Sequence, residues 1–163
     1  MLPHFVRITF FTYFCTMALE IEHKYLVVGD CYRHMASERK EIIQGYLCRT
    51  PERTVRVRTI GKKGFLTVKG KNDGDTRLEF EYEIPYDDAV KLLDMCEPGT
   101  IDKTRFLVSF KGMVWEVDEF HGARKGLVVA EVEIPYSGYE YEKPPFVGEN
   151  VTGNPDYYNS NLG

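Results

Sequence analysis

The feature that most constrains the fold of this chain is the alternation of charged and apolar residues along short segments. The segment 77–84, RLEFEYEI, shows it most clearly, with an apolar set formed by Leu78, Phe80, Tyr82 and Ile84 and an acidic set formed by Glu79, Glu81 and Glu83. Successive side chains of a β-strand point to opposite faces. The alternation therefore predicts strands with one apolar face and one charged face.

Eight segments follow this pattern or resemble it: 18–28, 42–49, 53–60, 65–71, 77–84, 101–110, 113–120 and 127–134. Glycine-containing turns such as 61–64 join many of them, which favours antiparallel pairing. An amphipathic helix is predicted over 87–96, a short helix within the polar connection 29–40, and loops with one short helix over the tail 137–163. The class is mainly β, as either a sandwich or a closed barrel, and periodicity does not choose between them.

Length and composition indicate one soluble globular domain. The chain has 163 residues, with 21 basic and 25 acidic side chains, so the net field does not favour nucleic acid as a partner. The four cysteines lack metal-binding spacing and predict neither a zinc site nor a disulfide framework. Reduced thiols and a cytoplasmic location are expected, and no apolar run is long enough for a transmembrane helix.

The first 16 residues, MLPHFVRITFFTYFCT, are aromatic-rich and contain no acidic residue. One interpretation is a weak signal peptide with a cleavage site near Ala18. The other is a start codon assigned too far upstream, because Met17 directly precedes the first strand. We prefer the second interpretation, and we divide the chain into an N-terminal extension, 1–17, and a domain, 18–163.

Charged residues of the same sign occur in pairs within single predicted strands. Paired cations occur as Arg56 with Arg58, Lys69 with Lys71, and Lys103 with Arg105, and paired acids as Glu20 with Glu22, Glu79 with Glu81, Glu116 with Asp118, and Glu131 with Glu133. Like charges on one strand face repel, and ordinary solvent faces mix them with neutral polar residues. The pattern fits a ligand site in which cations bind a polyanion and carboxylates hold a hard divalent ion such as Mg²⁺. It fits charged side chains facing water around an apolar core equally well.

Six motifs in order carry a family resemblance. They are EIEHK in the first strand, RVR in the third, TVKG in the fourth, EFEYEIP in the fifth, IDKTRF in the sixth and AEVEIP in the eighth. Together they resemble the CYTH family, also called triphosphate tunnel metalloenzymes, from about Ala18 to the tail motif VTGNPDYYNSNL. Glu-x-Glu-x-Lys alone is a weak signal, whereas six ordered motifs are specific.

The resemblance implies a closed barrel of eight antiparallel strands with a charged lumen and a few flanking helices. It implies triphosphate-binding cations at Lys24, Arg56, Arg58, Lys69, Lys103 and Arg105. It implies metal carboxylates at Glu20, Glu22, Glu131 and Glu133, with supporting positions at Glu79, Glu81 and Asp118. Lys24, Lys103 and Glu22 are the residues expected to take part in catalysis. Lys71 and Glu116 are set aside as structural, and His23, where the family motif commonly has Arg, is expected to point out of the tunnel.

The activity implied is hydrolysis of inorganic tripolyphosphate to pyrophosphate and phosphate by a metal-activated water, with two Mg²⁺ ions, or Mn²⁺ in their place. The alternatives are a class IV adenylate cyclase, a thiamine or nucleoside triphosphatase, and a module that binds polyphosphate without turnover. No nucleic-acid or membrane partner is expected. The oligomeric state is left open between monomer and homodimer.

Overall fold

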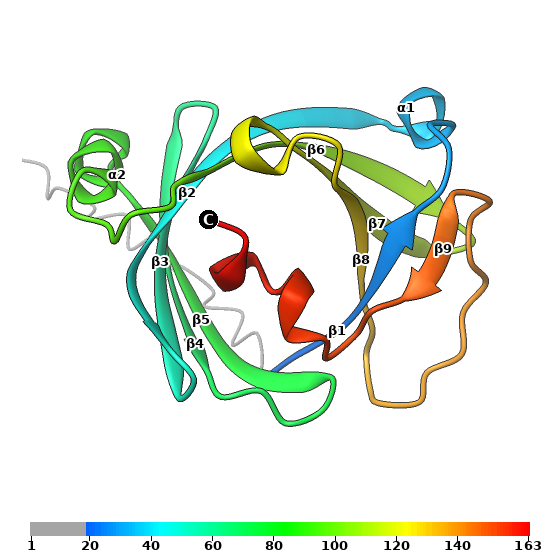
Figure 1. The fold of residues 1–163 in the computed structure, drawn as a ribbon. Helices are drawn as coiled ribbons and strands as arrows, with labels where there is room; N and C mark the ends of the chain where they lie inside the picture. Colours follow the sequence, from blue (N-terminus) through cyan, green and yellow to red (C-terminus); the bar gives the residue numbers. More distant parts are fainter. Residues whose placement is uncertain (1–18) are drawn as a thin grey trace, which may run out of the picture.

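The computed structural model describes residues 19–163 and consists mainly of one closed antiparallel β-barrel (Figure 1). Its eight barrel strands are β1 (Leu19–Val27), β2 (Glu38–Thr50), β3 (Arg53–Ile60), β4 (Lys63–Gly70), β5 (Thr76–Ile84), β6 (Ile101–Phe110), β7 (Met113–Phe120) and β8 (Val128–Glu133). They follow the order β5-β4-β3-β2-β6-β7-β8-β1, and a β5–β1 pairing closes the ring. The barrel is therefore confirmed, and the sandwich is excluded.

Closure depends on a short ladder between the first half of β1 and the start of β5. Leu19 lies opposite Leu78, Glu20 opposite Arg77, and Ile21 opposite Thr76. The second half of β1 then leaves β5 and pairs with β9 (Val147–Asn150) along that edge, while β8 follows its other edge. Strand β1 therefore belongs both to the closed barrel and to the ladder with β9.

Strand β2 and helix α2 (Tyr86–Leu93) differ from their predicted boundaries, and one strand was not predicted. The helix was predicted over 87–96 and ends at Leu93. Strand β2 begins at Glu38 rather than Ile42, because residues 38–41 pair with Leu107–Thr104 of β6 despite their polar composition. Strand β9 lies in the tail that was expected to form loops, and two 3₁₀ helices, η2 (Pro155–Tyr157) and η3 (Asn159–Asn161), follow it. A segment of four residues, such as β9, is too short to show strand periodicity in the sequence. It becomes a strand because it pairs with β1.

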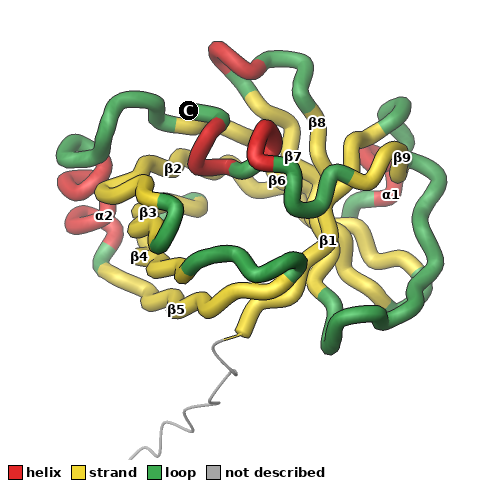
Figure 2. The backbone as a smooth tube through the Cα atoms, turned by 60° about the horizontal axis from the view of Figure 1, so that its bottom comes forward, coloured by secondary structure: helices red, strands yellow, loops and turns green. Residues whose placement is uncertain are grey.

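The helices other than η2 and η3 are also short and lie around the barrel wall (Figure 2). They are α1 (Tyr32–Met35), α2 (Tyr86–Leu93) and the 3₁₀ helix η1 (Gly122–Arg124). Helix α2 packs closely on β4, since a Cβ at Gly64 would come within 2.5 Å of the Ala89 side chain. None of the helices in residues 19–163 is long and apolar enough to cross a membrane.

Apolar residues form two separate cores. The larger, made of Tyr25, Tyr32, Phe106, Val108, Trp115, Val117, Ala130, Val132 and Phe146, includes residues of the β6-β7-β8-β1 wall together with α1 and the segment before β9. The smaller, made of Tyr46, Ile101, Phe120, Val129 and Leu162, brings barrel strands together with the C-terminal segment. Val129 and Phe120 share a strand face with Glu131 and Asp118, so the smaller core fills one end of the barrel interior and leaves the rest for polar side chains.

The two ends of the barrel, here called mouths, differ in what surrounds them. Because the strands alternate in direction, the β2–β3 and β4–β5 turns lie at one mouth and the β3–β4 and β6–β7 turns at the other. The segment containing η2 and η3 lies across the first of these, which we call the C-terminal mouth (Figure 1). The second, where β8 ends, we call the acidic mouth.

Candidate active site in the barrel tunnel

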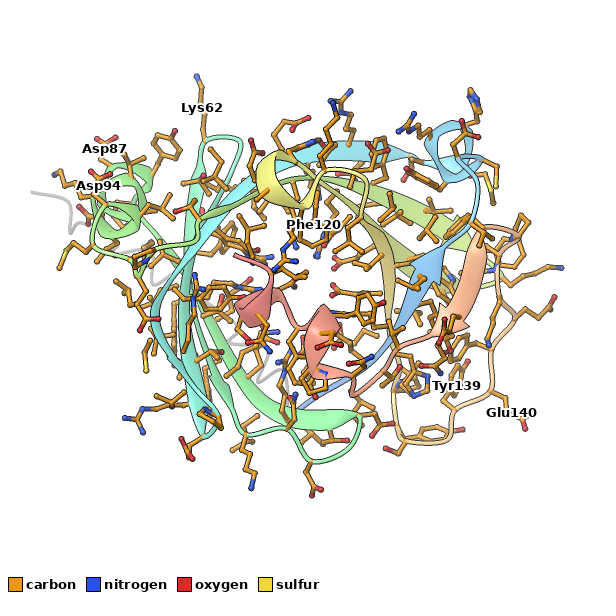
Figure 3. All side chains as sticks on the ribbon, viewed as in Figure 1. Lys62, Asp87, Asp94, Phe120, Tyr139 and Glu140 are labelled. Atoms are coloured by element: carbon orange, nitrogen blue, oxygen red, sulfur yellow. The ribbon has the colours of Figure 1, made fainter. Side chains whose placement is uncertain are left out.

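A polar cavity of about 360 Å³ lies inside the barrel. Ten of the thirteen residues predicted for the site line it: Glu20, Glu22, Arg56, Arg58, Lys69, Glu79, Glu81, Arg105, Glu131 and Glu133. Side chains with nitrogen and oxygen atoms extend into the ring in Figure 3, whereas Lys62 and Asp94 point away from it. The structure therefore brings these ten residues together around one cavity.

Three predicted residues do not line this cavity. Lys103 and Asp118 are completely buried and form an ion pair with each other at 2.6 Å. Lys24 lies beside a smaller cavity of about 50 Å³, its Nζ 2.7 Å from Glu131 and donating a hydrogen bond to the carbonyl of Tyr157 at 3.0 Å. Lys103 is therefore not placed to contact a ligand in the main cavity.

Arg105 is the centre of a buried ion-pair network. Its Nε and Nη2 each donate to a different oxygen of Asp118 at 2.6 Å, Nη2 also donates to Glu131 at 3.1 Å, and Nη1 donates to Glu116. Burial opposes ionisation of Asp118, but Arg105 and Lys103 outweigh it and lower its pKa. Bidentate pairing of this kind fixes the plane of a guanidinium, so Asp118 orients Arg105.

A second network joins β1, β4 and β5. Lys69 donates to both oxygens of Glu20 at 3.0 Å and lies 2.9 Å from Glu79, and Arg77 donates to Glu20 at 2.6 Å. Burial opposes ionisation of Glu20, yet Lys69 and Arg77 lower its pKa. Glu20 is thus a charged carboxylate with its cations already in place.

Arg56 and Arg58 face the cavity from β3. Arg58 donates to both oxygens of Glu81 at 2.9 and 3.0 Å, and Arg56 donates to Glu81 at 3.5 Å. The Nε atom of each arginine is buried and has no hydrogen-bond partner in the structure. Buried donors without acceptors are costly, so these two arginines retain unused capacity to bind an anion.

Glu22 and Glu133 differ from the other acidic residues. They lie directly opposite each other in the β1–β8 ladder. Among residues 19–163 neither carboxylate accepts a hydrogen bond, and the one cation within 4 Å is Arg77, 3.7 Å from Glu22. Burial and the neighbouring Glu131 and Glu20 raise the pKa of Glu22 to about 7, and burial with Glu20 and Glu116 raises that of Glu133. Within residues 19–163, Arg77 at 3.7 Å is thus the one cation that partly offsets the charge of this pair.

The donor set around that pair fits a hard divalent ion. Oxygen ligands from one or two carboxylates, completed by water and phosphate, are the usual protein environment of Mg²⁺. A cavity of about 470 Å³ at the acidic mouth is lined by five glutamates and by no cation: Glu20, Glu22, Glu116, Glu131 and Glu133. Glu22 and Glu133 are the residues of this set that remain free to hold an ion.

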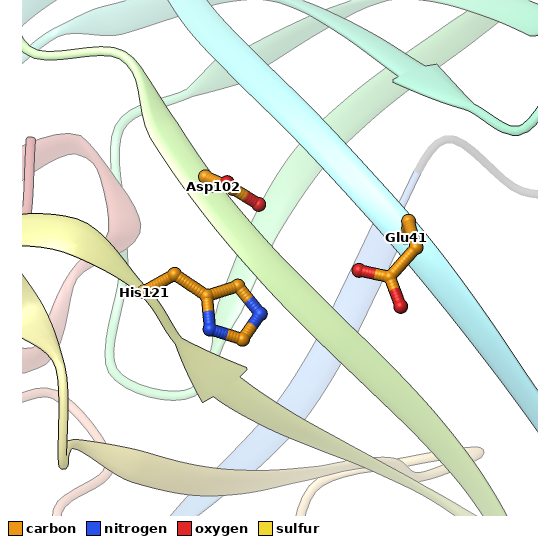
Figure 4. Close-up of side chains that lie close together, drawn as sticks. All are labelled: Glu41, Asp102 and His121. Atoms are coloured by element: carbon orange, nitrogen blue, oxygen red, sulfur yellow. The ribbon is translucent and has the colours of Figure 1, made fainter.

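A separate group of possible metal ligands, Glu41, Asp102 and His121, lies on the outside of the barrel (Figure 4). Their ligand atoms lie within 4.8 Å of one another. Glu41 already accepts hydrogen bonds from Arg39 and Thr104, and His121 shares a hydrogen bond with Thr104. The group does not include any of the carboxylates expected from the sequence and has no contact with the tunnel cavity.

Sequence reasoning missed three polar residues that line the tunnel: Arg77, Glu116 and Asn159. Glu116 was recognised as half of an acidic pair but set aside as structural, whereas the structure places it in the lining of the cavity. Arg77 precedes the acidic alternation of β5, and its role follows only from its position opposite Glu20. His23 points out of the tunnel as expected, with its ring nitrogens near Tyr141 and Asp75.

Comparison with known proteins agrees with this arrangement. The model of the CYTH domain family matches residues 18–158. An inorganic triphosphatase of Acetivibrio thermocellus is 46% identical over 149 residues, which cover 90% of this chain and 94% of that protein. Because the family model spans most of the chain, the protein belongs to the CYTH family.

Solved structures share the same barrel. The inorganic triphosphatase NE1496 aligns with a TM-score of 0.61 and 30% identity, covering 88% of this chain and 93% of the other. The PH1012 protein of Pyrococcus horikoshii aligns with a TM-score of 0.59 and 20% identity over 72% of this chain and 79% of that chain, and at this identity it supports the fold alone.

Proposed function

We propose that this protein hydrolyses inorganic tripolyphosphate to pyrophosphate and phosphate within the barrel tunnel, with a divalent cation. The observation that carries the proposal is the set of cations from four strands that line one cavity: Arg56, Arg58, Lys69, Arg77 and Arg105. Charges inside a barrel are costly unless they are paired or bind a ligand. The named activity of the relatives at 46% and 30% identity supports the same choice.

Phosphate oxygens would complete the hydrogen bonding of the tunnel arginines. Arg56 and Arg58 each have an unpartnered Nε, and Arg105 is held in a fixed plane by Asp118. Guanidinium groups bind phosphate with paired, charge-assisted hydrogen bonds. A linear triphosphate offers oxygens along its length to cations on β3, β4 and β6, so the phosphate chain would be gripped at several points.

Glu22 and Glu133 would hold the divalent ion at the acidic side of the cavity. When bound, such an ion polarises the phosphoryl oxygens and favours deprotonation of the attacking water. The remaining carboxylates predicted as metal ligands have other partners: Glu20, Glu79, Glu81, Asp118 and Glu131 are each ion-paired to lysine or arginine. We assign these five mainly to positioning the cations.

Lys103 would then act through its neighbours rather than by touching the substrate. It is buried against Asp118, and burial lowers the pKa of its ammonium to about 8 although Asp118 opposes the shift. Asp118 in turn orients Arg105. Lys24 links Glu131 to the C-terminal segment through Tyr157 and so positions one end of the tunnel.

The test is phosphate release from tripolyphosphate with added Mg²⁺, compared with ATP hydrolysis and with formation of cyclic AMP from ATP. We expect tripolyphosphate to be hydrolysed much faster, because the tunnel binds phosphate and the large aromatic side chains of β5, Phe80 and Tyr82, are exposed on the outer surface. Comparable efficiency in forming cyclic AMP would overturn the proposal and favour the cyclase. Binding of tripolyphosphate without turnover would favour the binding module.

A matched pair of arginine variants tests the site itself. Arg58→Ala removes a cavity cation, whereas Arg39→Ala removes an arginine that is 65% exposed on β2. Loss of one charged hydrogen bond costs roughly 1.5–3 kcal/mol, so kcat/KM should fall about 10- to 150-fold in Arg58→Ala. Arg39→Ala should remain within twofold of the wild type.

A further inference from the structure

The two mouths of the tunnel carry opposite charge. At the acidic mouth the 470 Å³ cavity is lined by five glutamates together with Gly112 of the β6–β7 turn and Pro135 after β8. At the C-terminal mouth a cavity of about 400 Å³ is lined by three cations, Arg49, Lys71 and Arg77, and by no acidic residue. An anion approaching the barrel would be attracted at one mouth and repelled at the other.

The cavity at the C-terminal mouth, here called the basic vestibule, is built from three separate segments. Arg49 comes from the end of β2, Lys71 follows β4, and Ser160 and Asn161 come from the C-terminal segment that covers the mouth. Its other polar lining consists of hydroxyl and amide groups, at Thr50, Thr54 and Asn72. A cavity lining of neutral donors and cations, with no carboxylate, is typical of an anion site.

Arg49 retains an unused donor in this vestibule. Its Nη2 donates to the carbonyl of Gly99 at 2.8 Å and its guanidinium lies over the Tyr46 ring at 5.0 Å, so the side chain is fixed in place. The Nε is buried and forms an ion pair with Glu97 at 3.7 Å, but within residues 19–163 it has no hydrogen-bond partner. Because 3.7 Å is longer than a hydrogen bond, this positioned donor could still take an acceptor.

Arg77 connects the vestibule to the tunnel. It lines the basic vestibule, the small cavity beside Lys24 and the main tunnel cavity. Its Nε is held by Glu20 at 2.6 Å, on the opposite strand of the closing ladder. Arg77 is therefore the cation that the vestibule and the tunnel share.

We propose that the basic vestibule is a second anion-binding site, which takes a phosphate group of an inorganic phosphate compound and passes it to or from the tunnel at the C-terminal mouth. The proposal rests on the function proposed above, because it supposes a phosphate ligand in the tunnel. It adds a separate site, formed by Arg49 and Lys71 and continued by Arg77, and names the mouth at which phosphate groups would pass. The metal-holding glutamates face the other mouth.

The experiment compares two charge reversals at opposite ends of β4. Lys71→Glu reverses a charge in the vestibule, and Lys62→Glu makes the same change in the exposed β3–β4 turn near the acidic mouth, where the side chain points outward (Figure 3). Arg49→Gln removes the second vestibule cation, with thermal unfolding measured as a check on folding. Each full-length variant is titrated with tripolyphosphate by calorimetry without metal, and then assayed with Mg²⁺ at low and high salt.

We expect Lys71→Glu and Arg49→Gln to weaken metal-free tripolyphosphate binding about fivefold and to raise KM by a similar factor at low salt, with kcat within twofold. At about 1 M salt, where the screening length is about 3 Å, the effect of Lys71→Glu on KM should disappear. Lys62→Glu should match the wild type throughout. An unchanged Lys71→Glu variant, or an equal loss in Lys62→Glu, would overturn the proposal. Because binding is measured without turnover, an absence of hydrolysis would count against the proposed activity alone.

Discussion

Replacing Asp118 by asparagine should destabilise the barrel more than any other change of one charge in the tunnel. Asp118 is completely buried and accepts hydrogen bonds of 2.6 Å from Lys103 Nζ, Arg105 Nε and Arg105 Nη2. Asparagine has nearly the same shape but keeps one acceptor oxygen and turns an amide NH₂ toward the cations. Lys103 and Arg105 are then buried without their principal counterion.

The magnitude follows from this geometry. Removing one partner of a buried ion pair typically costs about 3–5 kcal/mol. At roughly 2–4 °C per kcal/mol for a chain of this size, the melting temperature should fall by about 6–20 °C. The loss should be present without any metal, since it arises from Lys103 and Arg105. A residue that acted only as a metal ligand would show no such loss in a metal-free buffer.

The assay is urea unfolding followed by circular dichroism in the presence of a chelator. Asp94→Asn, an exposed carboxylate at the end of α2, is the matched control and should stay within about 0.5 kcal/mol of the wild type. Adding Lys103→Met to Asp118→Asn removes the stranded ammonium and should recover at least about 1 kcal/mol relative to Asp118→Asn alone. An Asp118→Asn variant within about 1 kcal/mol of the wild type would refute the reasoning.

Three further outcomes are expected. A chain beginning at Met17 should match the full chain in melting temperature and activity, because β1 begins at Leu19, and a large loss of either would contradict this. Glu133→Gln should raise the Mg²⁺ concentration for half-maximal activity several-fold with little change in stability. Glu131→Gln should in addition lower the free energy of unfolding by about 3 kcal/mol, since Lys24 and Arg105 lose their partner. Equal behaviour of the two variants would disprove the separate roles given to these glutamates. Leu162→Ala should cost about 2–4 kcal/mol, measured by urea unfolding, because the side chain is 3% exposed in the smaller core.

The position of the N-terminal segment, residues 1–16, lies outside the described residues, so the choice between a signal peptide and an upstream start remains a prediction. Cys15 also lies outside the described residues, so its state as a reduced thiol remains a prediction. The other three cysteines, Cys31, Cys48 and Cys96, are free thiols in the structure.

Much of the site could be predicted from the sequence because strand periodicity is local. Alternation over 77–84 separates Glu79 and Glu81 from Phe80 and Tyr82 without knowledge of any partner strand, and the structure places the two glutamates in the tunnel and the two aromatic residues on the outer surface. The order of six short motifs was enough to indicate the family and therefore the closed barrel. Both signals can be recognised in the sequence because neither depends on how distant strands pair.

The pairing of charges was decided only by the tertiary structure. Closure of β1 on β5 puts Arg77 opposite Glu20, and the β1–β8 register puts Glu22 opposite Glu133 and Lys24 opposite Glu131. A shift of one residue in either ladder would have exchanged these partners. Which glutamates are neutralised and which are left for a metal is therefore a property of register, which depends on residues more than 50 positions apart and cannot be found in any single segment.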